Sequence, residues 1–333
     1  MARAHLVGSF PRDTAEEVFR TVAGELNGSV GRIPDGETGD RKGWFTQQLR
    51  VLSKAPGIES APPKQAGARP FPQIRLGVPA DRVVFPPLGY VDHARASYES
   101  FSRLREAGVI AADVRFQFCL PTPLAVVGAF VVAEDQASFY DVYEPAVLQE
   151  LAAVCEVVPA ADLAVQWDVA IETAMLERKM PHWFGDDVFA DIVGLLAGLG
   201  DAVPTDAELG FHLCYGYYER RHFKDPDDLG LLVRVANALD AATQRRIDFI
   251  HMPVPADRGV PSYFEPLKGL ELADVELYLG LVHDDGLGPA TARAKVAREV
   301  LGTTRDFGVA TECGMGQYPA DAAIGLLRTH AEL

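Results

Sequence analysis

The unit that decides the fold reads Leu163-Ala-Val-Gln-Trp-Asp168, then a helical pattern over residues 187–199, then Glu208-Leu-Gly-Phe-His-Leu-Cys-Tyr215. The first and last of these segments are short and contain branched and aromatic side chains, which is typical of strands. The segment between them has apolar residues at helical spacing. This order predicts two parallel strands that are joined by a crossover helix.

The same alternation extends along the whole chain. Eight such units predict an α/β fold that closes into a (β/α)8 TIM barrel. A doubly wound open sheet is the alternative, but no glycine-rich dinucleotide fingerprint follows the first run to support it. The predicted strands are 5–10, 29–33, 114–119, 163–168, 208–215, 247–253, 276–283 and 307–313, and the predicted helices are 13–26, 41–52, 92–105, 135–157, 187–199, 227–242, 289–301 and 319–333.

A proline-rich stretch interrupts the alternation after the second unit. Residues 54–90 include Ala-Pro-Pro-Lys, Arg-Pro-Phe-Pro and Phe-Pro-Pro-Leu, and they are too many for a simple barrel loop. We expect this stretch to form a lid or a surface appendage. The chain as a whole, residues 1–333, is predicted to be a single barrel domain with this loop inserted.

Composition and charge exclude several classes of protein. The 333 residues are 48% hydrophobic, as in ordinary globular proteins, and a chain of this size needs no disulfides for stability. The net charge of −16 argues against nucleic acid, which requires a concentrated basic face. No apolar stretch reaches the ~20 residues of a membrane span, and the N-terminus lacks the apolar run of a signal peptide. We therefore expect a cytoplasmic protein that binds neither nucleic acid nor a membrane, and whose four cysteines are reduced.

Polar side chains gather at the predicted strand ends. In a (β/α)8 barrel the active site forms where the strands end, so residue types at these positions indicate function. Each one alone is more typical of a buried core residue than of a ligand, but their coincidence at one rim favours a site. The residues are Ser9, Asp35, Glu37, Gln117, Cys119, Asp168, His212, Cys214, His251, His283 and Cys313.

The strongest element among them is His212-Leu213-Cys214. Because side chains alternate along a strand, residues two apart project to the same side, here into the barrel mouth. Imidazole and thiolate are preferred zinc ligands, and His251 and Cys313 from later strand ends could complete a tetrahedron. A His-x-Cys pair by itself is common.

Two cysteines stay outside this set. Cys155 falls inside the apolar pattern of a long predicted helix, which indicates a core residue. Cys119 lies at a strand end beside Pro121 and has no histidine at ligand spacing, so its role stays open.

Five motifs occur in order along nearly the whole chain: Gly8-Ser9-Phe10-Pro11-Arg12, Asp35-Gly36-Glu37, Gln166-Trp167-Asp168, His212-Leu213-Cys214-Tyr215 and Glu312-Cys313-Gly314-Met315. Together they resemble the C-terminal catalytic barrel of cobalamin-independent methionine synthase. That family comprises zinc-dependent thiol methyltransferases. Its barrel superfamily also contains uroporphyrinogen decarboxylase and coenzyme M alkyl transferases.

The resemblance implies a role for each matching residue. The family's zinc ligands fall on His212, Cys214 and Cys313. Ser9 would meet the carboxylate of homocysteine, and Glu37 and Asp168 would meet its ammonium group. His283, in Gly280-Leu281-Val282-His283, resembles the histidine that serves as general acid in methyl transfer.

The chain departs from the family pattern at the sixth strand. The family takes a glutamate ligand there, whereas this sequence has His251. A set of two cysteines and two histidines around Zn²⁺ would be neutral rather than −1, and would hold a substrate thiolate more tightly while leaving it less nucleophilic. A closed structural site and the loss of zinc are the alternatives.

A second departure concerns length. The folate-using members of the family carry an additional N-terminal barrel, whereas here the first predicted strand begins within a few residues of Met1. The methyl donor therefore stays open, with a corrinoid protein or a folate as the candidates.

The sequence thus predicts a zinc-dependent methyltransferase that resembles 5-methyltetrahydropteroyltriglutamate–homocysteine S-methyltransferase. It would transfer an alkyl group, expected to be methyl, to a small-molecule thiol or amino acid substrate. One alternative is a divergent barrel that catalyses a lyase, decarboxylase or specialised-metabolite alkyl transfer reaction with an altered metal site. Another is a non-catalytic binding protein that retains the amino acid pocket.

Overall fold

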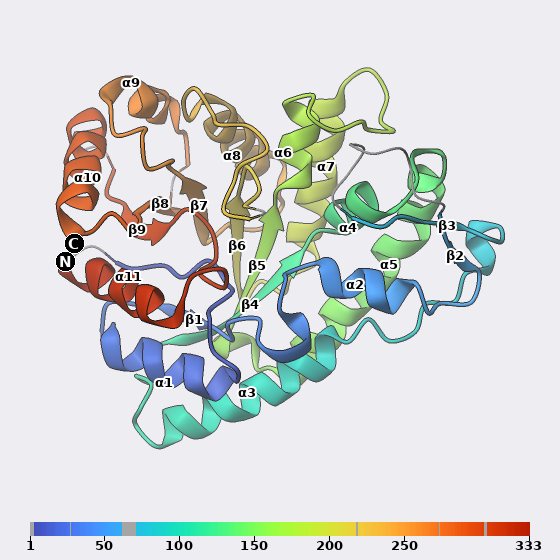
Figure 1. Ribbon diagram of the computed structural model, residues 1–333, viewed down its shortest axis with the longest axis horizontal. Coiled ribbons are helices and arrows are strands. Elements are labelled where there is room, and N and C mark those ends of the chain that lie inside the picture. Colours follow the sequence, from blue (N-terminus) through green and yellow to red (C-terminus); the bar gives the residue numbers. More distant parts are fainter. Residues whose placement is uncertain (1–2, 27, 62–70, 218, 273, 303–304) are drawn as a thin grey trace.

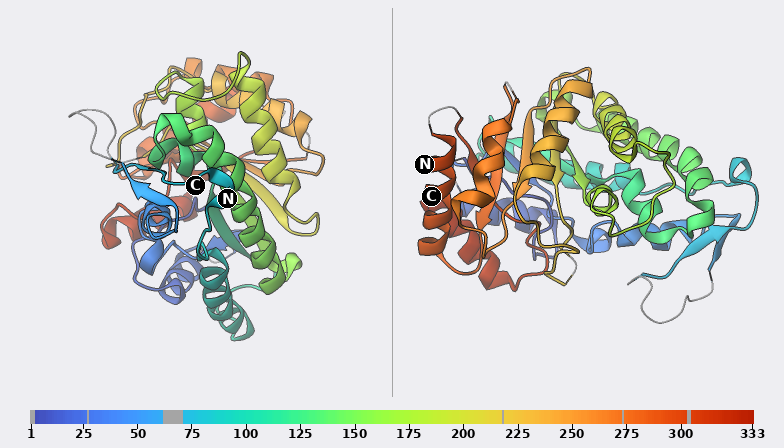
Figure 2. Two further views of the ribbon diagram at one scale, coloured as in Figure 1. Left: turned by 90° about the vertical axis from the view of Figure 1, so that its right-hand side faces the viewer. Right: turned by 90° about the horizontal axis from the view of Figure 1, so that it is seen from above.

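A curled parallel sheet forms the centre of the molecule, and helices cover its outer face (Figures 1 and 2). The computed structural model describes residues 3–26, 28–61, 71–217, 219–272, 274–302 and 305–333. Seven strands pair in the order β1-β4-β5-β6-β7-β8-β9, and each of these pairings is parallel. They are β1 (Arg32–Pro34), β4 (Arg115–Pro121), β5 (Leu163–Val169), β6 (Glu208–Leu213), β7 (Phe249–Pro253), β8 (Glu276–Val282) and β9 (Gly308–Thr311).

Helices lie between successive strands of this sheet. The α-helices are α1 (Ala15–Glu25), α2 (Thr46–Leu52), α3 (Tyr90–Glu106), α4 (Pro123–Phe130), α5 (Gln136–Val157), α6 (Ile171–Leu176), α7 (Val188–Asp201), α8 (Gly230–Ala242), α9 (Pro261–Phe264), α10 (Leu287–Leu301) and α11 (Ala320–Glu332). The 3₁₀ helices are η1 (Gly39–Arg41), η2 (Ala80–Arg82), η3 (Ala133–Asp135), η4 (Ala160–Asp162) and η5 (Glu265–Gly269). Within the described ranges, no helix is both long and apolar enough to span a membrane.

The sheet has an apolar outer face and a mixed inner face. Along β5 every residue is buried, and Val165 and Trp167 belong to the large core that the helices cover. The alternate residues point inward, and a separate small cluster of Ala164, Phe249 and Tyr278 packs there. The predicted parallel α/β sheet is therefore confirmed, with each strand buried on both sides.

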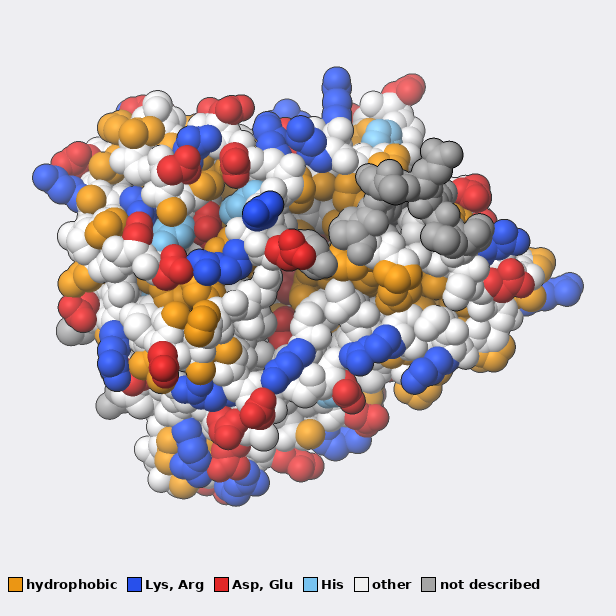
Figure 3. All heavy atoms as spheres, in the orientation of Figure 1, with side chains coloured by type: hydrophobic (Ala, Val, Ile, Leu, Met, Phe, Trp, Pro, Cys, Tyr) orange, Lys and Arg blue, Asp and Glu red, His pale blue; other side chains and the backbone are white. Residues whose placement is uncertain are grey.

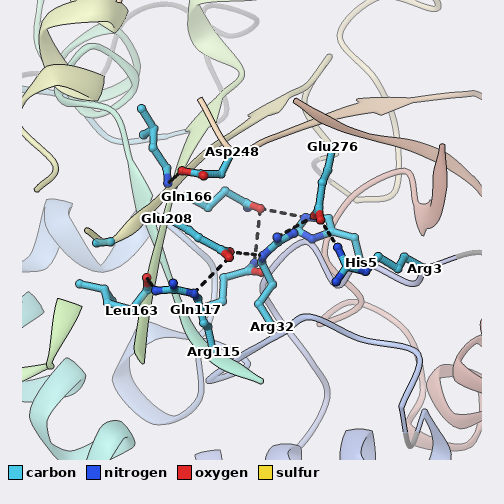
Figure 4. A network of polar contacts seen from close by, with 12 residues as sticks. Arg3, His5, Arg32, Arg115, Gln117, Leu163, Gln166, Glu208, Asp248 and Glu276 are labelled. Atoms are coloured by element: carbon cyan, nitrogen blue, oxygen red, sulfur yellow. Dashed lines mark hydrogen bonds and ion pairs between the residues drawn. The ribbon is translucent and has the colours of Figure 1, made fainter. Parts of the chain in front are cut away.

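One end of the enclosed space is filled by an ionic network (Figure 4). Arg32 of β1 is buried, and its Nε and Nη2 donate to Glu208 and Glu276 over 2.9 and 2.8 Å. Its guanidinium carbon lies 4.0 Å from the centre of the Phe249 ring. These residues stand at the start of their strands, so this network closes the amino-terminal end of the sheet and leaves the opposite end for a site.

The N-terminal segment lies between the two edge strands. Ala4 forms isolated parallel bridges with Val30, just before β1, and with Val309 of β9. The amide of His5 also donates to the Val309 carbonyl over 2.9 Å. Residues 3–5 thus contact both edges of the seven-stranded sheet.

The predicted strand over residues 5–10 is wrong beyond residue 5. The Leu6 carbonyl accepts from Gln117 Nε2 over 2.9 Å, and the Val7 carbonyl accepts from Gln166 Nε2 over 2.6 Å. Side chains inside the sheet, rather than a neighbouring backbone, therefore take these carbonyl groups, and the regular ladder ends.

The other predicted elements correspond to observed ones with shifted ends. The strand predicted at 29–33 is observed as β1, over Arg32–Pro34. Each of the eight predicted helices overlaps an observed helix. Helix α4 was not predicted, because its sequence is apolar on every side. Thr122 begins it by accepting from the Ala125 amide over 3.0 Å, and Pro123 occupies the first helical turn.

The proline-rich stretch contains an antiparallel hairpin of β2 (Ile58–Ser60) and β3 (Ile74–Leu76), and its residues 62–70 lie outside the described ranges. The hairpin lies at one end of the molecule (Figure 2). Ile74 forms a bridge with Val131, and the Leu76 amide donates to Asp135 over 2.8 Å. The described part of the stretch is therefore attached at the junction of α4 and α5.

Acid is expected to destabilise the fold through His330 of α11. This side chain is buried, its Nδ1 lies 2.7 Å from the Leu326 carbonyl, and burial lowers its pKa to about 4. An unfolded histidine binds a proton near pH 6.5, so this contribution to stability is present above pH 6.5 and is lost as the pH falls towards 4. Between pH 7 and pH 5 the loss is about 2 kcal/mol.

Urea unfolding of the wild type and of His330→Gln at these two pH values measures this loss. The wild type should lose more stability than the variant over this interval, because glutamine takes up no proton. Parallel pH dependences of the two proteins would contradict the prediction.

Candidate metal centre and adjoining pocket

His212, Cys214 and Cys313 come together where β6 and β9 end. One ligand atom from each lies within 4.8 Å of the other two. His212 belongs to β6, whose register places it between Asp168 of β5 and His251 of β7. Cys214 follows two residues later on the same side, and Cys313 comes from the loop after β9. The structure thus brings together three of the four residues in the predicted metal set.

The two cysteines affect each other's acidity. The hydrogen bond from Cys313 holds the pKa of Cys214 well below its usual range, and His212 acts in the same direction. The same hydrogen bond, together with burial, raises the pKa of Cys313. Cys214 is therefore the more acidic thiol of the pair.

His251 lies against His212 and outside the group of three. The Nδ1 atoms of the two imidazoles are 2.6 Å apart. His251 is completely buried, and burial holds its pKa well below the usual range, with His212 and His5 acting in the same direction. His251 is thus a neutral imidazole in direct contact with a candidate ligand.

The donor set fits a zinc ion. One imidazole and two thiols are donors that zinc prefers, and catalytic zinc sites have three protein ligands and one open position. The Nε2 atom of His212 is buried and has no hydrogen-bond partner among the described residues. A metal would give this nitrogen the partner that the protein itself does not provide.

Two buried carboxyl groups adjoin this centre. Burial raises the pKa of Glu37 to about 8, with the charge of Asp168 contributing, and burial raises the pKa of Asp168 to about 6. Glu37 follows Gly36 in a tight turn, and both have positive φ. Gln166 donates to Asp168 over 2.8 Å. Arg41 opposes the rise in pKa at Glu37 and His212 opposes it at Asp168, but burial outweighs both, so a further positive charge would favour the ionised acids.

Asp35 turns away from these acids. Its carboxylate pairs with Arg41 at 2.5 Å and accepts from the Ser97 hydroxyl over 3.1 Å. Its other oxygen accepts from the Glu37 amide over 3.0 Å. Asp35 therefore holds the turn that presents Glu37.

Ser9 contacts the loop that carries Cys313. Its carbonyl accepts from the Met315 amide over 2.7 Å, and its hydroxyl oxygen accepts from the Gly316 amide over 3.2 Å. A side chain at Gly314 would collide with the Ser9 hydroxyl. The close approach of these two segments requires glycine at position 314.

His283 lies beside Glu312, a residue to which the sequence motifs assigned no role. Its Nε2 is 2.9 Å from the Val254 carbonyl, and its Nδ1 is 3.4 Å from Glu312 Oε2. Burial lowers the pKa of His283 to about 4 and raises that of Glu312 to about 8, with Cys214 contributing to the latter. Because a carbonyl only accepts, the proton of neutral His283 is on Nε2, and its Nδ1 can accept from a protonated Glu312.

His222 completes this cluster on the other side of Glu312. Its Nε2 lies 3.2 Å from Glu312 Oε1, and both side chains are buried. His222 was not among the candidate residues that the sequence indicated. For Glu312, the signal in the sequence was its position directly before Cys313.

The remaining cysteines have structural positions. The Cys119 thiol donates to the Val7 carbonyl over 3.2 Å, and burial raises its pKa well above the usual range. It shares the sheet interior with Gln117 and Gln166. Cys155 is half-buried on α5 and packs against the core, as its apolar pattern predicts.

The surface is hollowed near the middle of the face in Figure 3, with acidic side chains in the depression and histidines at its left.

The fold belongs to the α/β class and has a curled parallel sheet at its centre. No protein-family model matches the chain, and no curated protein sequence matches it. Among solved structures, the fold is similar to that of a B12-independent methionine synthase from Shewanella sp. W3-18-1 in complex with selenomethionine, with a TM-score of 0.62 and 13% identity over 99% of this chain and 95% of that one.

Two further structures share the fold. One is a Listeria monocytogenes protein provisionally described as a vitamin-B12-independent methionine synthase, with a TM-score of 0.59 and 14% identity over 100% of this chain and 98% of that one. The other is a methyltransferase from Methanosarcina mazei, with a TM-score of 0.54 and 14% identity over 96% and 86% of the two chains. At these identities the comparisons show a common fold.

Proposed function

We propose that this protein is a zinc-dependent methyltransferase built on a closed (β/α)8 barrel, and that its acceptor is the thiol of an amino acid resembling homocysteine. The observation that carries the proposal is the meeting of His212, Cys214 and Cys313 within 4.8 Å at the strand ends. The fold shared with a B12-independent methionine synthase supports it.

His212, Cys214 and Cys313 would hold the metal. The thiol of the substrate has a pKa of about 8.5 and is mostly protonated at neutral pH. Bound zinc would supply the positive charge that favours its nucleophilic thiolate form. The chain's own contribution is to bury these donors, since Cys214 is 3% exposed. Removal of water strengthens their interaction with a bound cation.

Glu37 and Asp168 would hold the amino group of the substrate. Burial raises the pKa values of both acids in spite of the nearby Arg41 and His212. An ammonium group would add positive charge at the two carboxyl groups and favour their ionised forms.

Ser9 would receive the substrate carboxylate. His283 is neutral, so to serve as the general acid it would first take up a proton from Glu312 on its Nδ1. The methyl donor would be a folate or a corrinoid protein.

Metal analysis and a thiol assay test this function. The purified protein is expected to contain about one zinc per chain. With 5-methyltetrahydrofolate or methylcobalamin as donor, it should methylate homocysteine at least about 10-fold faster than 4-mercaptobutanoate, because the latter lacks the amino group that a buried acid pair recognises.

The outcome separates the parts of the proposal. A protein that binds no zinc would overturn the thiolate chemistry. Equal rates with the two thiols would remove the role given to Glu37 and Asp168. Intact zinc with no reaction of homocysteine with either donor would instead favour the specialised alkyl transfer that the sequence left as an alternative.

A further inference from the structure

The contact between His212 and His251 decides which nitrogen of the ligand faces a metal. Their Nδ1 atoms are 2.6 Å apart, which is a hydrogen-bond distance. Two unprotonated nitrogens would repel each other at this distance, so one N–H lies between the two rings. The Nε2 atoms of both rings are buried without a hydrogen-bond partner in the described part of the chain, and of the two residues it is His212 that belongs to the group with Cys214 and Cys313.

We infer that His251 is a positioning residue, which accepts a hydrogen bond from His212 Nδ1 and thereby directs His212 Nε2 to the metal. The inference rests on the proposed function. A neutral imidazole carries one proton, so a proton fixed on Nδ1 leaves Nε2 with the free lone pair that a metal requires. Histidine ligands generally donate their second ring N–H in this way.

The fold holds His251 in this position. His212 and His251 are register partners on the adjacent strands β6 and β7, so their side chains project inward at the same level. His251 is completely buried, and its ring centre lies 5.8 Å from that of His5. Its own register partner on the far side is Tyr278 of β8. An imidazole enclosed on both sides cannot turn without disturbing these strands.

This arrangement gives a site with three protein ligands. With His251 hydrogen-bonded to His212, the group within 4.8 Å consists of His212, Cys214 and Cys313. A substrate thiolate can then occupy the fourth position without displacing a side chain. In the set of two cysteines and two histidines predicted from the sequence, His251 would take the fourth position, and a thiolate would have to displace a ligand or bind as a fifth one.

Zinc affinity and spectroscopy of two variants test the role of His251. Full-length wild type, His251→Gln and His251→Leu are freed of metal, and zinc affinity is measured by competition with a chromogenic chelator. Glutamine keeps an amide oxygen that can accept from His212, whereas leucine cannot accept. We expect His251→Leu to bind zinc roughly 10- to 100-fold more weakly than wild type, and His251→Gln to recover most of this loss.

X-ray absorption of the zinc-loaded wild type identifies the ligands directly. One imidazole and two sulfurs are expected, and a second imidazole would overturn the inference. His330→Gln controls for the loss of a buried histidine away from the site, and it should bind zinc like the wild type. A readout without metal is the proton NMR signal of the shared N–H, which His251→Leu should abolish.

These results distinguish the inference from the proposed function. If wild type binds zinc and both variants at position 251 bind it equally well, His251 does not position His212, but the metal site stands. If both variants lose zinc to the same extent and absorption shows two imidazoles in the wild type, His251 is a ligand. If wild type binds no zinc, the proposed function and this inference both fail.

Discussion

Cys214→Ser is expected to weaken zinc binding by about 100-fold or more. This is a larger effect than is usual for substitution of a residue that only hydrogen-bonds a metal ligand. Cys214 is the more acidic of the two cysteines, since the hydrogen bond from Cys313 holds its pKa well below the usual range. A serine hydroxyl stays protonated in this pH range, so the site loses one negative charge and one sulfur donor. Thiol methylation should be lost with the metal, because the acceptor thiol is no longer deprotonated.

Chelator competition and zinc content measure this effect, and Cys155→Ser is the matched control. Cys155 is the half-buried cysteine that packs on α5, far along the chain from the candidate ligands. Its substitution should leave zinc affinity unchanged. The metal site would be wrongly assigned if Cys214→Ser retained about one zinc per chain with the affinity of the wild type.

Arg41→Met is expected to destabilise the fold by about 3–5 kcal/mol, the usual loss when one partner of a buried ion pair is removed. Arg41 and Asp35 are both buried, and their charged atoms are 2.5 Å apart. Arg41 also donates to the Cys119 carbonyl over 2.8 Å, and its guanidinium carbon lies 4.4 Å from the centre of the Phe118 ring. Methionine fills similar space but leaves the Asp35 carboxylate without a counter-charge.

Urea unfolding measures this loss, with Arg20→Met as the control. Arg20 forms an exposed pair with Glu16 on α1, and the loss of such a pair has no measurable effect in most proteins. The double variant Asp35→Leu/Arg41→Met should regain much of the stability, because it removes the isolated charge as well. The account fails if Arg41→Met is as stable as Arg20→Met, or if the double variant is less stable than Arg41→Met.

Periodicity was sufficient for the strands and helices that depend on packing. The runs at 163–168 and 276–283 correspond to β5 and β8, because strands with both faces buried require the apolar residues that mark them in a sequence. The N-terminal segment could not be predicted in this way. Whether Leu6 and Val7 pair with a strand depends on Gln117 and Gln166, which are more than 100 residues away and donate to their carbonyls instead.

The site was predictable to the extent that it follows from spacing. Alternation alone placed His212 and Cys214 on one side of a strand. The contact of His251 with His212 could not be deduced, because a ligand and the partner of a ligand occupy the same register level. Glu312 was also not assigned a role, since its contacts with His222 and His283 come from two separate loops.

Side chains along β6 point alternately to the two faces of the sheet, and this alternation limits the insertions that the site can tolerate. Insertion of a single residue within Glu208–Leu213 would exchange the two faces of the strand, so that an imidazole would enter the helical layer and an aliphatic side chain would face the mouth. Additions to the loops leave that phase intact. The site therefore depends on the length of the strand and on a few residues in the right alternation, which place few demands on the rest of the sequence.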